Sequence, residues 1–293
     1  MSDQKRFENI STLILSILVI ITLLPILLLV ITSFTDESVI LTQGYTFFPT
    51  KLSVASYYYM IKQGAIIFRA YGISILVTVA GTIVSVLITA MLGYPMSRKD
   101  FKYSKILSFF VFFTMLFNGG VVSSYIMWSR FFQIKDTIWA LILPNYLVTA
   151  VNVFLVRNYY TTSIPDSLIE SAQLDGASEG TIFFKIILPL SVPTIATISL
   201  FTGLMYWNDW TNGLYFITDS RLYGIQNLLI RIMNNIQALK SSSASMMGAS
   251  SVELPSFSVR MAMAFIGILP ILLIYPFIQK YLIRGVVVGA VKG

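Results

Sequence analysis

ESAQLDGASEGTIFFKIILP, residues 170–189, is a polar stretch in a chain that is otherwise strongly apolar. It carries four charged residues, two glycines and a late proline. Hydrophobic residues make up 56% of the 293 residues and charged residues only 11%, whereas a soluble domain carries roughly 25% charged residues. The composition therefore predicts an integral membrane protein in which this stretch stays in water.

Six apolar runs are long enough to cross a membrane as helices, which need about 20 residues. They lie at 10–33, 70–94, 106–128, 137–156, 190–212 and 260–281. We therefore expect an all-α, polytopic membrane protein with six transmembrane helices in a single transmembrane domain, 1–293. The polar stretch then belongs to a loop at 157–189, and the long loops on the other side are 34–68 and 213–259.

Basic residues indicate which side each loop faces, because short cytoplasmic loops are enriched in Lys and Arg. The loop after the second run, PMSRKDFKYSK (95–105), holds four of them, whereas the short loop after the third run holds only Arg130 and Lys135. Basic residues also precede the first run and follow the last. Both termini and the loop 157–189 are therefore predicted to be cytoplasmic. A net charge of +7 placed in this way sets orientation and does not indicate nucleic-acid binding.

Several classes of activity are excluded by what the sequence lacks. The chain has no cysteine and no histidine, which removes disulfides, thiol nucleophiles and the usual zinc sites. The cores of the six runs contain no ionisable residue, although ion-coupled transporters need one near the midplane. A nucleotide-binding GxxxxGK[ST] loop is absent as well. We expect no catalytic residue, no metal site and no bound cofactor, which leaves a passive channel or one subunit of a driven machine.

The stretch 164–189 itself predicts a helix–turn–helix. Pro165 suits a first helical turn, and Gly176 is placed where a helix end requires a left-handed residue. Ser178 can cap a second short helix, which Leu188 and Pro189 would end. A rigid element of this kind outside the bilayer suits docking to a soluble partner, although a solvated connector fits the pattern equally well.

The spacing of this stretch resembles the EAA loop of ABC importer permeases: Glu-x-Ala, three residues, Gly, nine residues, then Ile-x-Leu-Pro. The matching positions are Glu170, Ala172, Gly176, Ile186, Leu188 and Pro189, and Ser171 replaces the middle Ala. The end of the chain, GVVVGAVKG (285–293), is similar to the C-terminus of MalG-type carbohydrate permeases. LPLSVPTIATISLFTGLMYWNDW (188–210) is similar to the branch of that family that handles complex oligosaccharides, in which the smaller permease subunit of the alginate importer falls.

The resemblance implies the type I ABC importer permease fold in a bacterial inner membrane, with a cytoplasmic coupling helix around Glu170–Gly176. It implies contact with a partner ATPase dimer, which binds ATP and Mg, through Glu170, Ala172, Asp175, Gly176, Leu188 and Pro189. The other implied partners are a second homologous permease, an extracytoplasmic substrate-binding protein, the sugar substrate and membrane lipid. A homodimeric permease for another solute and a passive channel or scaffold remain the alternatives.

The stretch YWNDW near the outer end of the fifth run offers a candidate substrate path. It comprises Tyr206, Trp207, Asn208, Asp209 and Trp210. Aromatic rings can stack on sugar faces while amide and carboxylate groups bond hydroxyls, but Trp and Tyr also form belts at membrane interfaces. Both interpretations stay open, and for an acidic sugar Arg130 or Lys135 would be better placed to meet the carboxylates.

Two patterns concern the helices themselves. Gly81, Ser85, Thr89 and Gly93 place a small residue at every fourth position of the second run, which favours close helix packing but is also common in membrane helices. Gly119–Gly120 in the third run predicts a break or a close crossing. Apolar residues in 228–239 predict an amphipathic helix, followed by a loop at 241–257.

Overall fold

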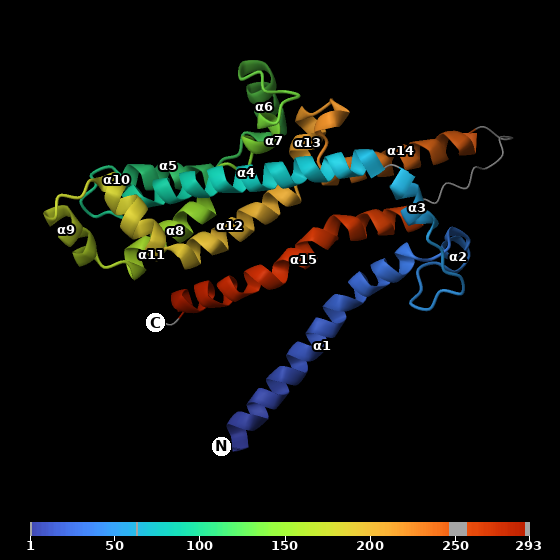
Figure 1. Ribbon diagram of the computed structural model, residues 1–293, viewed down its shortest axis with the longest axis horizontal. Coiled ribbons are helices and arrows are strands. Elements are labelled where there is room, and N and C mark those ends of the chain that lie inside the picture. Colours follow the sequence, from blue (N-terminus) through green and yellow to red (C-terminus); the bar gives the residue numbers. More distant parts are fainter. Residues whose placement is uncertain (1, 63, 246–256, 291–293) are drawn as a thin grey trace. The chain divides into compact units, whose positions relative to one another are not determined.

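The computed structural model describes residues 2–62, 64–245 and 257–290, and within them the chain is helical, as expected (Figure 1). An isolated bridge between Thr35 and Leu52 is the one extended pairing in these residues. The first elements are α1 Ser2–Ser33, α2 Glu37–Gln43, α3 Ala55–Lys62, α4 Gly64–Ser97, α5 Ser104–Leu116, α6 Gly120–Ile126, the π-helical turn η1 Met127–Phe131, α7 Trp139–Ile142 and α8 Ala150–Ser163. They are followed by α9 Asp166–Leu174, α10 Glu179–Ile182, the π-helical turn η2 Phe183–Ile187, α11 Leu188–Leu190, α12 Val192–Trp207, α13 Thr211–Phe216, the 3-10 turn η3 Ser220–Leu222, α14 Ile225–Ser245 and α15 Phe257–Ala290.

The chain forms two compact units. The first comprises Met1–Ile67 with Leu228–Leu272, and the second comprises Phe68–Asn227 with Leu273–Gly293. The expected helix at 228–239 lies within α14, whereas most of the expected loop at 241–257 falls outside the described residues.

In the first unit, Glu37 joins two segments that are far apart in the sequence. Its carboxylate accepts hydrogen bonds from the backbone N–H groups of Phe257 at 2.9 Å and Ser258 at 3.0 Å, and from the Ser258 hydroxyl at 2.8 Å. These donors belong to the first turn of α15, where a helix leaves N–H groups unpaired and favours a negative charge. Nearby, a hydrogen bond from Lys51 lowers the pKa of Asp36 to about 2, so this cap of α2 stays ionised at neutral pH.

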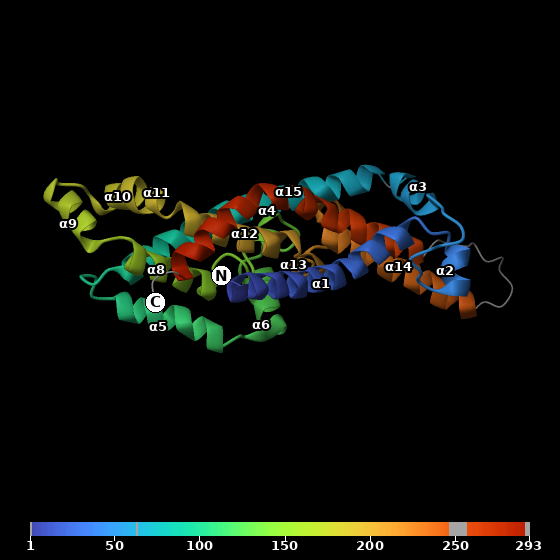
Figure 2. The same cartoon turned by 90° about the horizontal axis from the view of Figure 1, so that it is seen from below.

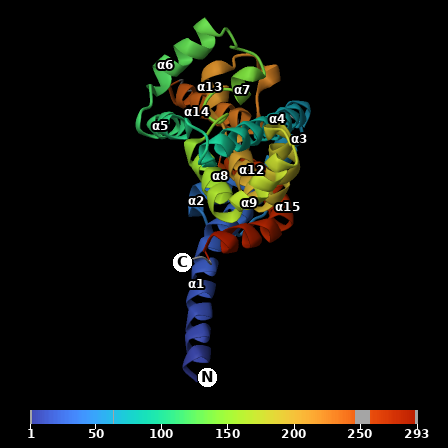
Figure 3. The ribbon, with the colours of Figure 1, turned by 90° about the vertical axis from the view of Figure 1, so that its left-hand side faces the viewer.

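In the second unit, the small face of α4 is a packing surface. Gly81, Ser85, Thr89 and Gly93 are all buried. A Cβ atom at Gly81 would lie 2.6 Å from the Tyr206 ring of α12, and one at Gly93 would lie 3.0 Å from a methyl group of Val156 in α8. The packing interpretation of this pattern is therefore confirmed. Figure 3 shows α8 with α5 on one side and α12 on the other, and α8 contacts both.

Among the described residues, three helices are long and apolar enough to cross a membrane, at Gln4–Ser33, Gly64–Ser97 and Phe257–Pro276. Two bent pairs raise the number to 5 if each counts as one span. One pair joins α5 to α6 and η1 at 116°, with Gly120 at a φ of +79°, so the expected break at this glycine pair is confirmed. The other pair joins α10–α11 to α12 at 81°.

The expected span at 137–156 is not one continuous helix. It consists of α7 and the start of α8, separated by irregular backbone at 143–149. Pro144 cannot donate a backbone hydrogen bond, and Asn145 adopts a φ of +69°. A helix cannot run through a left-handed residue, so the apolar run is interrupted although its composition indicates a span.

Prediction: replacing Gly81 by Ala lowers stability, whereas replacing Gly72 by Ala in the same helix does not. The new Cβ at position 81 would meet the Tyr206 ring at 2.6 Å, and nothing lies within 4 Å of one at position 72. Overpacking of this kind costs about 1–3 kcal/mol. Thermal unfolding of the two purified variants in detergent measures the difference, and equal midpoints would contradict the packing of α4 on α12.

Candidate functional site

The polar stretch folds into a corner between α9 and α10, which we define as residues 170–178. The N–H of Ala177 donates to the C=O of Ala172 at 3.0 Å, and the N–H of Gly176 donates to the C=O of Gln173 at 3.0 Å. This pair of bonds is the Schellman motif, which needs a left-handed residue at the position of Gly176. Gly176 has a φ of +78°, so its expected conformation is confirmed. The Ser178 hydroxyl accepts from the Thr181 N–H at 3.3 Å and caps α10, as expected.

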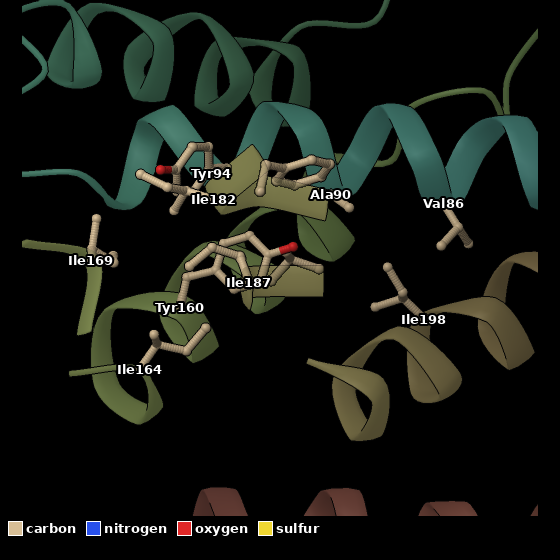
Figure 4. Close-up of a cluster of buried hydrophobic side chains, with 11 residues drawn as sticks. Val86, Ala90, Tyr94, Tyr160, Ile164, Ile169, Ile182, Ile187 and Ile198 are labelled. Carbon is tan, nitrogen blue, oxygen red and sulfur yellow. The ribbon is translucent and has the colours of Figure 1, made fainter. Parts of the chain in front are cut away.

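One side of this corner packs onto the helices of the second unit. The buried cluster in Figure 4 is formed by Val86, Ala90, Tyr94, Val156, Tyr160, Ile164, Ile169, Ile182, Phe183, Ile187 and Ile198. Ala172 and Ala177, which share a Schellman bond, pack against the edge of this cluster. The cluster draws on α4, α8, α9, α10, η2 and α12. The corner is therefore attached through apolar contact to three of the long helices.

The other side of the corner is exposed. Glu170 and Asp175 are both exposed, and the side chain of Leu174 between them is 89% exposed. Figures 1 and 2 place α9 at the end of the bundle formed by α4, α8 and α12. The tip of the second unit thus presents an apolar side chain flanked by two carboxylates, a surface that suits a protein partner.

The second helix of the corner does not stop at Pro189, contrary to expectation. It continues through the π-helical turn η2 and α11 and ends at Leu190. Because Pro189 has no N–H, the regular bond to Lys185 is lost, and the Leu188 N–H bonds to the Phe183 carbonyl five residues back. Leu188 is half-buried against the apolar cluster and Pro189 is exposed, so both occupy the elbow that leads into α12.

A second arrangement of polar groups surrounds the break after α7. We call residues 142–146, from the last residue of α7 into the irregular backbone, the broken segment. The carbonyl of Ile142 accepts from the Tyr206 hydroxyl at 2.8 Å, and that of Pro144 accepts from the Asn212 amide at 3.2 Å. The carbonyl of Tyr146 accepts from the Ser85 hydroxyl at 3.1 Å. The three donors come from α12, α13 and α4. Backbone groups freed from a helix away from water must be satisfied in this way.

The stretch YWNDW divides between structural and exposed residues. Tyr206 caps the broken segment, and the buried Trp207 ring lies 6.2 Å from Tyr71 between ring centres. Oδ1 of Asp209 accepts from the N–H groups of Thr211 at 3.0 Å and Asn212 at 3.2 Å, which are the first two N–H groups of α13.

Asn208 and Trp210 are the exposed members of YWNDW. The Asn208 amide donates to the Leu204 carbonyl of its own helix at 2.9 Å. The Trp210 side chain is 42% exposed. A recess beside Asp209 is lined also by Ser74, Tyr206 and Asn227, but it has room for only about one or two water molecules. A sugar could therefore meet Asn208 and Trp210, whereas the recess is too small for one.

The two cations considered for an acidic solute, Arg130 and Lys135, are both exposed. Neither forms an ion pair within the part of the chain that the structure describes. The neighbouring Asp136 accepts from the Thr218 hydroxyl and from the Asp219 N–H, and these bonds lower the pKa of its carboxyl. Asp136 thus holds the loop around 134–137 against 216–219 and keeps its charge at neutral pH.

Several residues of the corner and of the broken segment have no local sequence pattern that predicts their hydrogen-bond partners. Tyr94 and Glu179 are hydrogen-bonded to each other although they lie 85 positions apart, and Asn145 bonds Asn212 across 67 positions. A sequence pattern covers neighbours in the chain, whereas these partners meet only through tertiary packing. The sequence feature that could indicate such a long-range hydrogen bond is an isolated polar residue within an apolar run, as for Ser85.

Comparison with known proteins shows a matching family and several relatives of this chain. Residues 85–288 match the family model described as "Binding-protein-dependent transport system inner membrane component". The chain is 37% identical over 274 residues to the polygalacturonan/rhamnogalacturonan transport system permease protein YtcP of Bacillus subtilis (strain 168), covering 94% of each chain. It is 28% identical to the arabinooligosaccharides transport system permease protein AraQ of Halalkalibacterium halodurans, covering 93% of this chain and 92% of the relative.

The fold has a counterpart among solved structures. A chain from the crystal structure of a bacterial ABC transporter involved in the import of the acidic polysaccharide alginate superposes with a TM-score of 0.78 at 24% identity. The match covers 96% of this chain and 98% of that chain. At this level of identity the likeness establishes the fold.

Prediction: replacing Tyr206 by Phe destabilises the protein, whereas replacing Tyr215 by Phe does not. The first change leaves the buried carbonyl of Ile142 without its donor, which costs about 1–3 kcal/mol. Tyr215 lies in the adjacent α13 and is 42% exposed, so water replaces its hydroxyl contacts. Chemical unfolding of both variants measures the loss. A Tyr206→Phe variant as stable as Tyr215→Phe would show that the broken segment does not depend on this cap.

Proposed function

Because the chain belongs to the family of binding-protein-dependent transport system inner membrane components, we propose that it is a permease subunit of an ABC importer for an oligo- or polysaccharide. In this proposal the chain contributes the membrane path, and a partner ATPase hydrolyses ATP. The transported solute arrives on an extracytoplasmic binding protein. A second, homologous permease completes the path across the membrane.

The observation that carries the proposal is the corner at 170–178. It combines the spacing of an EAA loop with a Schellman turn at Gly176 and an exposed Leu174 flanked by carboxylates. A rigid, convex element of this kind can seat in a groove of a soluble subunit. We infer that Glu170, Asp175 and Leu174 face that subunit, while Ala172 faces the apolar cluster and Gly176 allows the turn.

The apolar attachment of the corner supports transmission of movement between α9 and the helices on which the corner packs. Its apolar side is packed on α4, α8 and α12, so a displacement of α9 moves these helices with it. Closely packed interiors have few discrete arrangements and move as rigid bodies. Closure of the ATPase dimer would thus switch the path between outward and inward access.

The topology that goes with this function has six spans, with both termini and the corner in the cytoplasm. Three long apolar helices and two bent pairs account for five of the spans. We propose that α7 and α8 with the segment between them form the other span. The capped carbonyls of 142–146 support this placement, because non-helical backbone is tolerated at membrane depth only where protein satisfies it.

The proposed substrate class rests on the relatives. The two permeases named above are described as transporting polygalacturonan/rhamnogalacturonan and arabinooligosaccharides. In this chain Asn208 and Trp210 are the members of YWNDW that remain exposed, and we assign contact with the solute to them. Arg130 and Lys135 are the exposed cations that could meet a carboxylate if the sugar is acidic.

Co-purification and uptake together test the proposed function. We expect the tagged chain, purified from the membranes of its native host, to retain an ATPase and a second permease through two columns. In proteoliposomes, that complex should take up labelled oligogalacturonides or arabinooligosaccharides only with ATP and a binding protein. A passive channel would instead move the sugar without ATP, and a chain that never retains an ATPase would rule out the importer.

Prediction: substitutions at Gly176 impair ATP-driven uptake according to how well each residue tolerates a positive φ. Val is excluded from this conformation, Asn adopts it readily, and nothing lies within 4 Å of a Cβ at this position. Gly176→Val should therefore lose most uptake per assembled complex, and Gly176→Asn should keep most of it. The matched control is Gly180→Ala, where space is equally open and φ is ordinary. Equal loss in the Val and Asn variants would point to side-chain bulk at the partner surface and contradict the conformational role.

A further inference from the structure

Glu179 joins the two sides of the corner to a long helix. Oε2 of its carboxylate accepts from the Tyr94 hydroxyl of α4 at 2.6 Å, and Oε1 accepts from the Gln173 amide of α9 at 2.9 Å. Glu179 itself is the first residue of α10. One carboxylate therefore ties the last turn of α9, the first turn of α10 and the cytoplasmic end of α4.

The C-terminal half of α9, which carries Leu174, has few other contacts with the rest of the protein. Ile169 is buried and Ala172 is half-buried, but Glu170, Ser171, Gln173 and Leu174 are exposed. The ion pair between Lys99 and Asp166 also reaches α9, but its side chains are 80% and 61% exposed, and such pairs contribute little. The tip that carries Leu174 is thus held by its own turn, by the packing of Ala172 and by the bond from Gln173 to Glu179, whose two residues are also exposed.

Tyr94 makes the opposite end of this link rigid. Its side chain is buried, and its ring lies 5.6 Å from the Phe183 ring within the apolar cluster. The bond from the Tyr94 hydroxyl to Glu179, at 2.6 Å, is short for an O–H···O bond. A buried ring and a short bond hold the start of α10 closely against α4.

We propose that Glu179 is a positioning residue for coupling: its carboxylate transmits displacement of the exposed tip of α9 to α4 through Gln173 and Tyr94. This inference rests on the proposed function, and it adds a residue outside the EAA spacing. Apolar contact through Ile169 and Ala172 is non-directional, whereas the two hydrogen bonds fix the distance and orientation of the tip relative to α4. Movement of the tip thereby becomes movement of α4.

The test is a double-mutant cycle with Tyr94→Phe and Glu179→Ala in the complete transporter. The readout is the ratio of sugar taken up to ATP hydrolysed, with both values normalised to assembled complex. A variant that only assembles less well or unfolds more easily leaves this ratio unchanged. We expect a several-fold fall for Glu179→Ala and a smaller fall for Tyr94→Phe. The double variant should equal Glu179→Ala, because both changes remove the same bond. Asp166→Asn, which removes the exposed ion pair between α9 and Lys99, is the matched control and should match the wild type.

Other outcomes separate the inference from the proposed function. If the wild-type complex hydrolyses ATP and moves no sugar, the proposed function fails. If the wild type transports and Glu179→Ala keeps its sugar-to-ATP ratio while unfolding at lower temperature, Glu179 is only structural and the inference is overturned. Additive effects in the double variant would likewise overturn the link through Tyr94. Should Glu179→Ala not accumulate, Glu179→Leu serves instead, since its side chain fills part of the same space and accepts neither hydrogen bond, and an unchanged ratio there is equally decisive.

Discussion

A backbone group that leaves a helix away from water must find its partner inside the protein, and this constraint shapes the second unit. The apolar run at 137–156 breaks at Pro144, and the carbonyls of Ile142, Pro144 and Tyr146 each accept from a side chain of a different helix. At the elbow, the Leu190 carbonyl also accepts from a side chain of another helix, the Tyr159 hydroxyl of α8 at 3.1 Å, here in an exposed position. The irregular segments are therefore also the places where separate helices are tied together.

The polar corner depends on that tied bundle. Its Schellman turn satisfies the end of α9 locally, so the corner needs no support from a partner to keep its shape. Its apolar side belongs to the same cluster as α4, α8 and α12. A surface that is shaped by its own backbone and anchored to three long helices can transmit movement, whereas a flexible loop of equal charge could not.

Local features of this fold could be predicted from the sequence, and long-range ones could not. Periodic apolarity, the Gly119–Gly120 break, the left-handed Gly176 and the Ser178 cap all depend on neighbours within one or two turns. The interruption at 143–149 was missed because hydropathy counts apolar side chains and does not register hydrogen bonds. Tyr206 and Asp209 suggested a sugar site by composition, yet Tyr206 bonds Ile142, which only the fold brings within reach, and Asp209 bonds its near neighbours Thr211 and Asn212. The helix that starts with α10 continues past Pro189 into α11 because the π-helical turn η2 before it accommodates the missing N–H donor.

The proposed docking of the corner to a partner ATPase is tested most directly by labelling Leu174→Cys with a maleimide, because the chain has no cysteine of its own. Leu174 is 89% exposed in the isolated chain, so the thiol should react quickly in the permease alone. Thr162→Cys, at another exposed position before α9, serves as the control. We expect assembly with the ATPase to protect position 174 strongly and position 162 little. Equal labelling of Leu174→Cys with and without the ATPase would contradict the docking role of the corner.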